Sequence, residues 1–429
     1  MPVHKRRRTV PGLRWWIATL LIGSTTFVMA LDRAAMTIAA PVIQKEFNFT
    51  LQQMSYVLAA FSWTYALFQI PSGWLAERYG PRRILFGASV LWSAFTALTP
   101  FGGGLAGLVT VRALLGTGQA ADWPSSVVAI KRWFPVAERA KGNSILLGSL
   151  YLGRVAAGPI TAWVVSELGW KPVFLIFGAL GIIVSACWYV GFRDDPASHP
   201  LIRPEEARLI LHGQTEKQAP PEPGVFARCL RSTQFWAMGL QYFCVIMIMG
   251  FFTTWLPTYL SQERHLDLKS VGGLSSLPFL TLFTVVLLAG RLADAVLKRT
   301  GSIWAARVPV AISGYLLSAT FLIAAMRMDS VTWMTVLLCL SLGSVGLIMV
   351  SIWSSAQDLG GGATGIITGW TNGWGNGADA VGAILVAYLV RVTGSWSTAL
   401  MMLAIVAAIA GPIFWLFVHP ERPIAHRKA

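Results

Sequence analysis

The stretch Gly73-Trp74-Leu75-Ala76-Glu77-Arg78-Tyr79-Gly80-Pro81-Arg82-Arg83 follows a long apolar segment of this chain. A shorter version, Gly290-Arg291-Leu292-Ala293-Asp294, follows another apolar segment in the second half of the sequence. In both stretches a glycine stands at the expected end of a helix, an acid follows four residues on, and a basic residue is close by. This echo indicates an internal repeat and predicts two similar halves.

Apolar segments long enough to cross a bilayer surround both stretches. The chain has 429 residues, of which 55% are hydrophobic and only 12% are charged, whereas about a quarter of a soluble domain is charged. A spanning helix needs about 20 mainly apolar residues. Segments of this kind are expected at about 15–40, 54–76, 84–102, 105–127, 143–166, 172–192, 235–260, 271–291, 305–326, 331–354, 363–390 and 395–418. The fold class expected is an all-α membrane protein with about twelve transmembrane helices in two six-helix halves.

A polar segment divides the two halves. Between residues 193 and 233 the hydrophobicity falls, and the segment contains Arg193-Asp194-Asp195-Pro196 and Ala219-Pro220-Pro221-Glu222-Pro223. We expect a linker here, with a short helix around 204–212. The predicted organisation is an N-terminal half at 1–192, a cytoplasmic linker at 193–233 and a C-terminal half at 234–429.

The net charge of +15 is spread over short basic clusters between the apolar segments. The clusters occupy alternate loops, beginning with Lys5 to Arg8 and Arg78 to Arg83, and the loops on the other side are poor in Lys and Arg. Basic loops stay in the cytoplasm, which predicts a multi-pass protein of a bacterial-type inner membrane with both termini inside. Nucleic-acid binding would need one basic patch instead. The first apolar run continues past a weak cleavage-site match at Val28-Met29-Ala30, so we expect an uncleaved first helix.

Cysteine and histidine placement argues against metal or catalytic chemistry. The four cysteines show no metal-ligand spacing, and all six histidines lie in tails, loops or span ends. Embedded hydrolases and acyltransferases usually need a buried histidine or clustered metal ligands. We therefore expect no cofactor, no metal and no enzymatic activity, with a membrane-embedded enzyme as a remote alternative.

The stretch at 73–83 resembles the signature between the second and third helices of the major facilitator superfamily. The resemblance implies a cytoplasmic charge network that latches the outward-facing state. Its members here are Gly73, Glu77, Arg78, Gly80 and Arg82, with Asp294 in the repeat. Glu77 stands where the family usually has Asp.

Further stretches resemble one branch of that superfamily, the anion:cation symporters, which include bacterial galactonate, hexuronate, glucarate and phthalate permeases. The matching stretches are Asp32 to Met36, Ala60 to Pro71, Arg112 to Gly116, Trp133 to Pro135 with Glu138-Arg139, and Thr254 to Leu260. The resemblance implies proton-coupled import of a sugar acid or other carboxylate by alternating access. An exchanger, a uniporter and a Na⁺-coupled carrier are the alternatives. The expected partners are a small organic anion, a coupling proton and the lipid bilayer, and we expect a monomer.

Asp32 and Arg33 lie within the first predicted span, where a charge costs about 2.5–3.5 kcal/mol even on the lenient insertion scale. The planar guanidinium of Arg33 suits a bidentate contact with a substrate carboxylate. Asp32 is the expected proton site, because burial disfavours the charged form of a carboxyl group. The other interpretation is that the pair holds helices together through other partners.

The fourth predicted span carries Arg112, Gln119 and Asp122, whose spacing places them near one helix face. In sugar-acid members of the family the Gln119 position is usually Glu, so a titratable group next to the arginine is missing. The proton role then stays with Asp32, moves to Asp122, or is absent. Asp122 alternatively pairs with Arg112 or Arg154. Arg154, in the fifth span, is either a second anion contact or the counter-ion of Asp122.

Asn372, Asn376 and Asp379 share one face of the eleventh span. They lie in a glycine-rich run, Gly369 to Gly382, that permits close packing or local unwinding. The resemblance implies that Asn372 bonds substrate hydroxyls. Asp379 is either a coupling acid or a partner for the amine of a zwitterion.

Three further cavity positions rest on the resemblance alone. They are Tyr65, Gln241 and Trp353. An aromatic residue in a membrane helix is otherwise more often a packing or interface residue.

Overall fold

A computed structural model describes residues 12–135, 138–212, 225–360, 364–422 and 424. Its described part is built from helices and connecting turns. The first half contains α1 Leu13–Trp16, η1 Ile17–Ile22, α2 Gly23–Glu46, α3 Leu51–Tyr79, α4 Pro81–Leu98, η2 Thr99–Phe101, α5 Leu105–Gln119, α6 Asp122–Trp133, α7 Arg139–Leu168 and α8 Trp170–Gly191. The segment after it contains η4 Pro196–Ser198, α9 Pro204–His212 and α10 Val225–Leu230. The second half contains α11 Thr233–Gly250, η5 Phe251–Trp255, α12 Leu256–Gln262, α13 Leu268–Thr300, α14 Ile303–Met326, α15 Val331–Gly360, α16 Thr364–Thr393 and α17 Trp396–Phe417.

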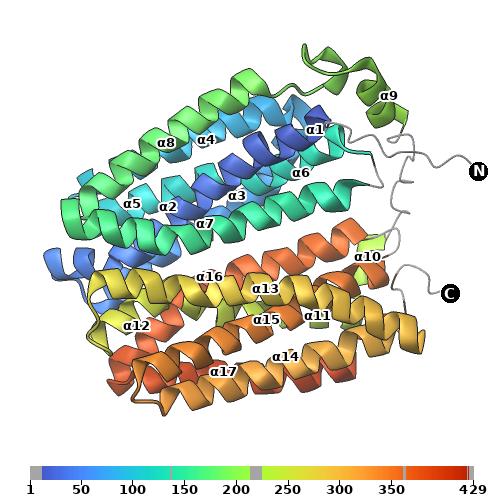
Figure 1. Ribbon diagram of the computed structural model, residues 1–429. Coiled ribbons are helices and arrows are strands. Elements are labelled where there is room, and N and C mark those ends of the chain that lie inside the picture. Colours follow the sequence, from blue (N-terminus) through green and yellow to red (C-terminus); the bar gives the residue numbers. More distant parts are fainter. Residues whose placement is uncertain (1–11, 136–137, 213–224, 361–363, 423, 425–429) are drawn as a thin grey trace, which may run out of the picture.

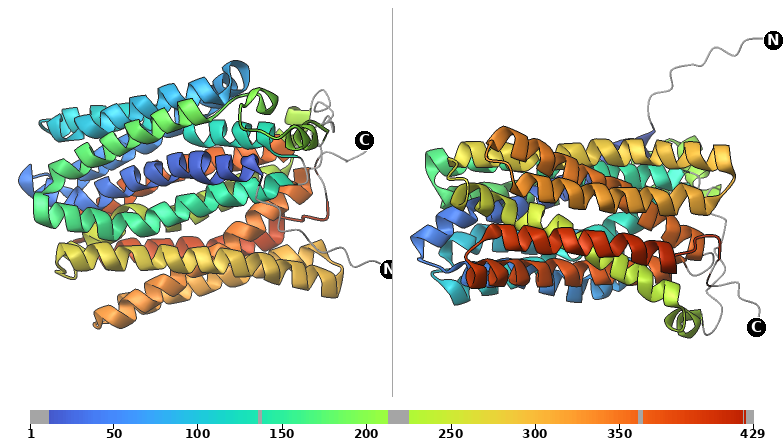
Figure 2. Two further views of the ribbon diagram at one scale, coloured as in Figure 1. Left: turned by 45° about the horizontal axis from the view of Figure 1, so that its top comes forward. Right: turned by 90° about the horizontal axis from the view of Figure 1, so that it is seen from below.

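The long helices form two groups that lie side by side (Figure 1). In the first group α2 packs on α7 and α8, and α4 packs on α8. In the second group α14 packs on α15 and α17, and α11 packs on α16. The groups meet where α7 lies against α13 and α3 lies against α16. Views from other directions show all these helices running roughly along one axis, with α9 beyond one end (Figure 2). We call that end the linker end and the other the far end.

Ten helical rods of the described residues are long and apolar enough to cross a membrane. The predicted second and fourth spans are not among these ten. The second is the 29-residue helix α3, which is rich in polar residues. The fourth is wrong as a continuous helix, because Ala120 and Ala121 form a turn between α5 and α6. The described residues thus form the expected twelve helical rods, but only ten of these rods are apolar enough to be recognised as membrane spans by hydropathy.

Several helix ends differ from the predicted ones for local reasons. Thr50 and Gln53 form a reciprocal capping box, so α3 begins at Leu51. Gly73 to Arg78 lie inside α3, and Gly290 to Asp294 lie inside α13, rather than following a helix. The chain turns at Gly80, whose φ of 89° and proximity to Asp194 leave no room for a side chain.

The short helix predicted around 204–212 is present as α9. Glu206 accepts hydrogen bonds from the backbone N–H of Leu13, at 2.8 Å, and of Arg14, at 3.1 Å. It also pairs with the Arg14 guanidinium at 2.8 Å, and the same guanidinium bonds Glu138 at 2.9 Å. Helix α9 is therefore attached to the first group of helices. The domain boundaries at 192 and 233 remain a prediction.

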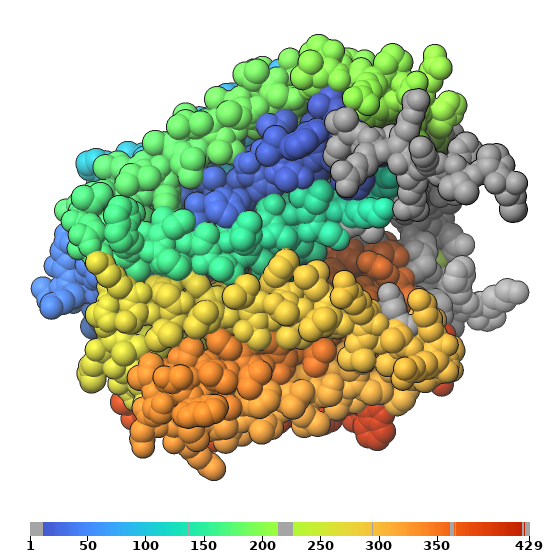
Figure 3. Space-filling view, viewed as in Figure 1, coloured from blue at the N-terminus to red at the C-terminus, as the bar shows by residue number. Residues whose placement is uncertain are grey.

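The two groups close on each other at the far end. Gln262 donates to Gln44 at 3.0 Å, and Lys269 pairs with Glu167 at 2.7 Å. Between these contacts and the centre, α7 and α13 cross so closely at Gly158 and Gly272 that a Cβ on either glycine would meet the other's backbone oxygen. In the space-filling view α7 and α13 touch over this part, while toward the linker end the surface of α16 shows between them (Figure 3). The two groups of helices are therefore in contact at the far end and separate from each other toward the linker end.

Candidate functional site

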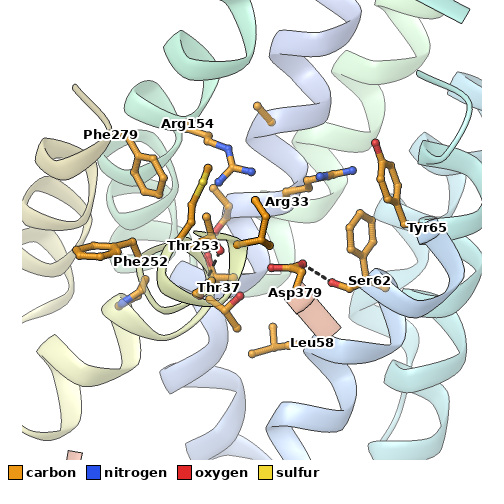
Figure 4. A pocket seen from close by; sticks show the side chains of 18 of the residues that line it. Arg33, Thr37, Leu58, Ser62, Tyr65, Arg154, Phe252, Thr253, Phe279 and Asp379 are labelled. Atoms are coloured by element: carbon orange, nitrogen blue, oxygen red, sulfur yellow. Dashed lines mark hydrogen bonds between the residues drawn. The ribbon is translucent and has the colours of Figure 1, made fainter. Parts of the chain in front are cut away.

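A cavity of about 170 Å³ lies between the two groups of helices. The first group contributes Arg33, Ser62, Tyr65, Arg112 and Arg154, and the second contributes Tyr242, Phe279, Asn372, Asn376 and Asp379. In Figure 4 Arg33 and Arg154 lie on one side of this space and Asp379 on the other. The polar groups come mainly from α2, α5 and α7 on one wall and from α16 on the other. A cavity built from both groups changes shape whenever they move relative to one another.

Arg33 is held on one side and free on the other. Its guanidinium carbon lies 4.3 Å from the ring centre of Tyr65 and 4.8 Å from that of Phe61. Its Nε donates to Gln119 Oε1 at 3.1 Å. Its Nη2 is buried and has no hydrogen-bond partner among the described residues. The aromatic platform fixes the guanidinium and leaves a donor for a ligand.

Arg112 and Arg154 add two more positive charges to the same cavity. Arg112 is 3% exposed and lies 4.8 Å over Phe61, and neither its Nε nor its Nη1 has a partner among the described residues. Arg154 lies 5.4 Å over Phe279. Within the described part of the chain, no carboxylate comes within ion-pair distance of these arginines. The earlier alternative that Arg154 is the counter-ion of Asp122 is therefore wrong, and its place on the cavity wall favours an anion contact.

Asp379 joins the two groups through a hydrogen bond. Ser62 Oγ on α3 donates to Asp379 Oδ2 on α16 at 2.5 Å. This bond is dashed in Figure 4. Helix α16 is continuous through the glycine-rich run, and at Gly375 the ring of Tyr242 packs on the backbone. Gly375 therefore serves close packing, and the run does not unwind.

Gln69 contacts both asparagines of the face predicted on the eleventh span. Its Oε1 accepts from Asn372 Nδ2 at 3.1 Å and from Asn376 Nδ2 at 2.6 Å. Its Nε2 donates to the hydroxyl of Tyr65 at 3.4 Å. Sequence reasoning missed Gln69 as a site residue. Its position one helical turn after Tyr65 was the available signal.

Asp32 and Asp122 do not line the cavity. Both are fully buried inside the first group, where Asp32 accepts from Thr96 at 3.4 Å and Asp122 accepts from Thr26 at 3.1 Å. A turn at Ala120 and Ala121 lies between Gln119 and Asp122, and Asp122 does not join Arg112 at the cavity. The partner expected for Asp122, Arg112 or Arg154, is replaced by the hydroxyl of Thr26.

Two residues expected at the cavity lie elsewhere. Gln241 is fully buried and donates to the backbone oxygen of Ala410 at 2.9 Å. Trp353 packs edge-on against Tyr242 with 5.2 Å between ring centres. Neither lines the cavity, whereas Tyr242, which the sequence did not indicate, does.

The predicted gating residues gather at the linker end. Glu77 pairs with Lys131 at 3.7 Å. The backbone N–H of Arg82 donates to Asp194, and its guanidinium donates to the backbone oxygen of Tyr189. Arg78 lies over the ring of Trp74. These contacts stay within the first half of the chain, and the side chain of Asp294 lies outside the described residues.

No group of three or more His, Cys, Asp or Glu side chains that could hold a metal ion occurs among the described residues. The chemistry of the cavity is instead that of an anion cradle with three guanidiniums, two amides and one carboxylate. The polar side chains of the cavity lie on both groups of helices, which are in contact at the far end and separate toward the linker end.

Residues 22–383 match the family model described as Major Facilitator Superfamily. The chain belongs to the major facilitator superfamily. Membership of the major facilitator superfamily makes it a multi-pass membrane transporter and confirms the expectation of transport over catalysis.

Curated relatives in this superfamily match over nearly the whole chain. The "Probable galactarate/D-glucarate transporter" of Escherichia coli strain K12 is 31% identical over 92% of this chain and 91% of its own length. The "D-galactonate transporter" of Escherichia coli O6:H1 is 31% identical over 95% of this chain and 96% of its length. The "Probable sulfoacetate transporter" of Cupriavidus necator is 30% identical over 92% and 91%. The resemblance to the anion:cation symporters is confirmed by these relatives.

The fold is confirmed by a solved structure of the same superfamily. A bacterial homologue of the human lysosomal transporter Spinster aligns with a TM-score of 0.77, covering 96% of this chain and 98% of its own. The sequences are 16% identical, so this match concerns the major facilitator fold alone.

Proposed function

We propose that this transporter carries a small organic anion, such as a sugar acid or another carboxylate, through a central site between its halves. One observation supports this most directly. Arg33, Arg112 and Arg154 face one cavity with no carboxylate at ion-pair distance among the described residues. Buried charges without partners cost several kcal/mol each, and a bound anion lowers that cost.

The names of the relatives agree with the proposed substrate class. Galactarate, D-glucarate, D-galactonate and sulfoacetate are all small organic anions. They share an anionic group on a short polar skeleton. The planar fork of Arg33 suits such a group, and Arg154 supplies a second cation on the same side of the cavity.

We propose a proton as the coupling ion, with Asp32 as its carrier. Asp32 is adjacent in sequence to Arg33, so a charge change at its carboxyl group alters the field at the anion site. It is fully buried and bonded only weakly, to Thr96. Asp122 and Asp379 are the competing carriers. Gln119 favours the alternatives, an exchanger, a uniporter or a Na⁺-coupled carrier, because an amide cannot bind the second proton.

The proposed orientation places the linker end in the cytoplasm of a bacterial-type cell. The basic loops gather at that end, including Arg82, Lys131 and Lys298. The structure then represents a state that is closed to the outside and parts toward the cytoplasm. During import, this is the state from which the substrate is released into the cytoplasm. We expect the transporter to work as a monomer, because the cavity is completed by one chain.

Purified protein in proteoliposomes tests the proposal. Counterflow of D-galactonate, D-glucarate and sulfoacetate measures transport without a driving ion. Proton coupling predicts that each transported anion makes the external medium more alkaline. Counterflow without alkalinisation would support the exchanger or uniporter, and dependence on a Na⁺ gradient would support a Na⁺-coupled carrier. Absence of counterflow for every small carboxylate and sulfonate would refute an organic-anion carrier.

A further inference from the structure

Two side-chain amides in the cavity converge on one oxygen atom. Asn376 Nδ2 lies 2.6 Å and Asn372 Nδ2 lies 3.1 Å from Gln69 Oε1. Both asparagines line the cavity. A carbonyl oxygen has two lone pairs, so this pair of donors satisfies one acceptor oxygen fully. The same arrangement would hold a hydroxyl or carboxylate oxygen of a ligand.

Gln69 comes from the opposite group of helices. It lies on α3 in the first group, whereas both asparagines lie on α16 in the second. It does not itself line the cavity, and its flexible side chain reaches across to the two amides. A ligand oxygen placed where the two amides converge would therefore displace the Gln69 amide.

Gln69 is also linked to the anion anchor. Its Nε2 donates to the Tyr65 hydroxyl at 3.4 Å, and the Tyr65 ring lies 4.3 Å below the Arg33 guanidinium. One chain of contacts thus runs from Asn376 through Gln69 and Tyr65 to Arg33. A ligand that binds Arg33 and the two amides at once would replace these contacts with its own.

We propose that Gln69 is a built-in competitor that occupies the oxygen-recognising site of Asn372 and Asn376 until substrate displaces it. This inference rests on the proposed function. It specifies the substrate as an acid with a second acceptor oxygen, a hydroxyl or a second anionic group, remote from the carboxylate that Arg33 binds. Displacement also breaks two hydrogen bonds between the halves, which couples recognition of that oxygen to their movement.

A pair of six-carbon acids tests the proposal by equilibrium binding to the purified full-length protein. D-Galactonate carries hydroxyls along its chain, and hexanoate carries none. Gln69→Ala removes the competitor, so it should lower the Kd of D-galactonate about two- to tenfold, the range expected for one net hydrogen bond. The Kd of hexanoate should not change. Asn376→Ala should weaken D-galactonate binding instead.

Gln262→Ala is the matched control, because it removes a different glutamine bond between the halves, to Gln44 at the far end. It should leave the ratio of the two Kd values as in the wild type. Equal gains for both acids in Gln69→Ala would mean that the substitution only loosens the halves, and the proposal would be wrong. An unchanged or weaker affinity for D-galactonate would overturn it as well.

A measurement without ligand separates this inference from the proposed function. Thermal unfolding of Gln69→Ala, Asn376→Ala and the double variant gives their coupling energy. A coupling energy of zero would overturn the competitor contact whatever the protein transports. A favourable coupling energy with no binding of either acid by the wild type would count against an oxygen-bearing carboxylate as the occupant of this site. Absence of counterflow for every small carboxylate and sulfonate, by contrast, would refute the proposed function itself.

Discussion

The Nε of Arg33 donates a hydrogen bond to Gln119 Oε1 at 3.1 Å. Gln119 is fully buried, and its own Nε2 has no partner among the described residues. A neutral amide thus fixes the orientation of the guanidinium without neutralising its charge. Gln119 therefore leaves the positive charge of Arg33 available to a bound anion.

Replacing Arg33 by lysine should abolish transport while the protein still inserts and folds. Lysine keeps the charge but loses the planar fork and the stacking on Tyr65 and Phe61. Truncating one side of a buried charged contact costs 2–5 kcal/mol, so we expect uptake to fall by about 30-fold or more. Arg391→Lys, at an exposed end of α16, is the control. Uptake by Arg33→Lys at the wild-type rate would contradict the role of Arg33.

Gln119→Glu should make anion binding depend on pH. An ionised carboxylate at this position would pair with Arg33 and compete with the substrate, which weakens binding by about tenfold at neutral pH. Protonation at acid pH removes the competing charge and restores binding. Titration of the Kd of both proteins between pH 5 and 8 checks this, and the variant should depend on pH more steeply than the wild type. A wild-type Kd that varies equally would show that another group controls the site.

Neutralising the coupling carboxyl group should separate accumulation from exchange. We expect Asp32→Asn to abolish accumulation driven by a pH gradient and to retain counterflow, because counterflow needs no net proton movement. Asp122→Asn and Asp379→Asn are measured in parallel. If Asp32→Asn still accumulates substrate and one of the other two does not, the proton carrier is that other residue.

A large side chain at Gly158 should prevent closure of the far end. Its Cβ would meet the backbone oxygen of Gly272 and the hydroxyl of Ser276 on α13, so Gly158→Leu forces α7 and α13 apart. We expect loss of transport and faster labelling of a cysteine placed at Gln262 by a membrane-impermeant thiol reagent. Gly273→Leu is the control, since a Cβ there meets nothing within 4 Å. Unchanged labelling in Gly158→Leu would show that this crossing does not close the far end.

Glu421 should stabilise the end of the chain only above acid pH. The backbone N–H of Trp304, at 3.1 Å, and the hydroxyl of Ser302, at 2.8 Å, both donate to its carboxylate and hold the pKa of Glu421 below its usual value. A lowered pKa means that the stabilisation is present above the unfolded-state pKa, about 4.3, and is lost as the pH falls through the folded-state pKa. Thermal melting of the wild type and Glu421→Gln should differ at pH 7 and converge near pH 3. A constant difference would exclude this titration as the cause.

The helical spans and the anion anchor were predictable because they depend on local properties. Backbone groups in lipid must bond within their own segment, so apolar length alone indicated most rods. A charge in such a rod is costly, which singled out Arg33 and Asp32. The break after Gln119 has a local cause that the prediction did not use, because Pro124 lacks the N–H that would bond the carbonyl oxygen of Ala120 and its ring crowds that carbonyl.

By itself, the sequence determined the all-helical class, the internal repeat and the charges that membrane burial makes exceptional. Only the tertiary structure decided which of those residues meet. Ser62 and Asp379 are 317 positions apart, and Gln69 and Asn372 are 303 apart. The physical reason is that helical periodicity fixes which face a residue occupies on its own rod, whereas the partner of that face depends on how two six-helix groups pack. For the same reason Gln241 and Trp353 lie outside the cavity although their residue types suit it. Packing of the two groups also brings Gln69 to Asn372 and Asn376.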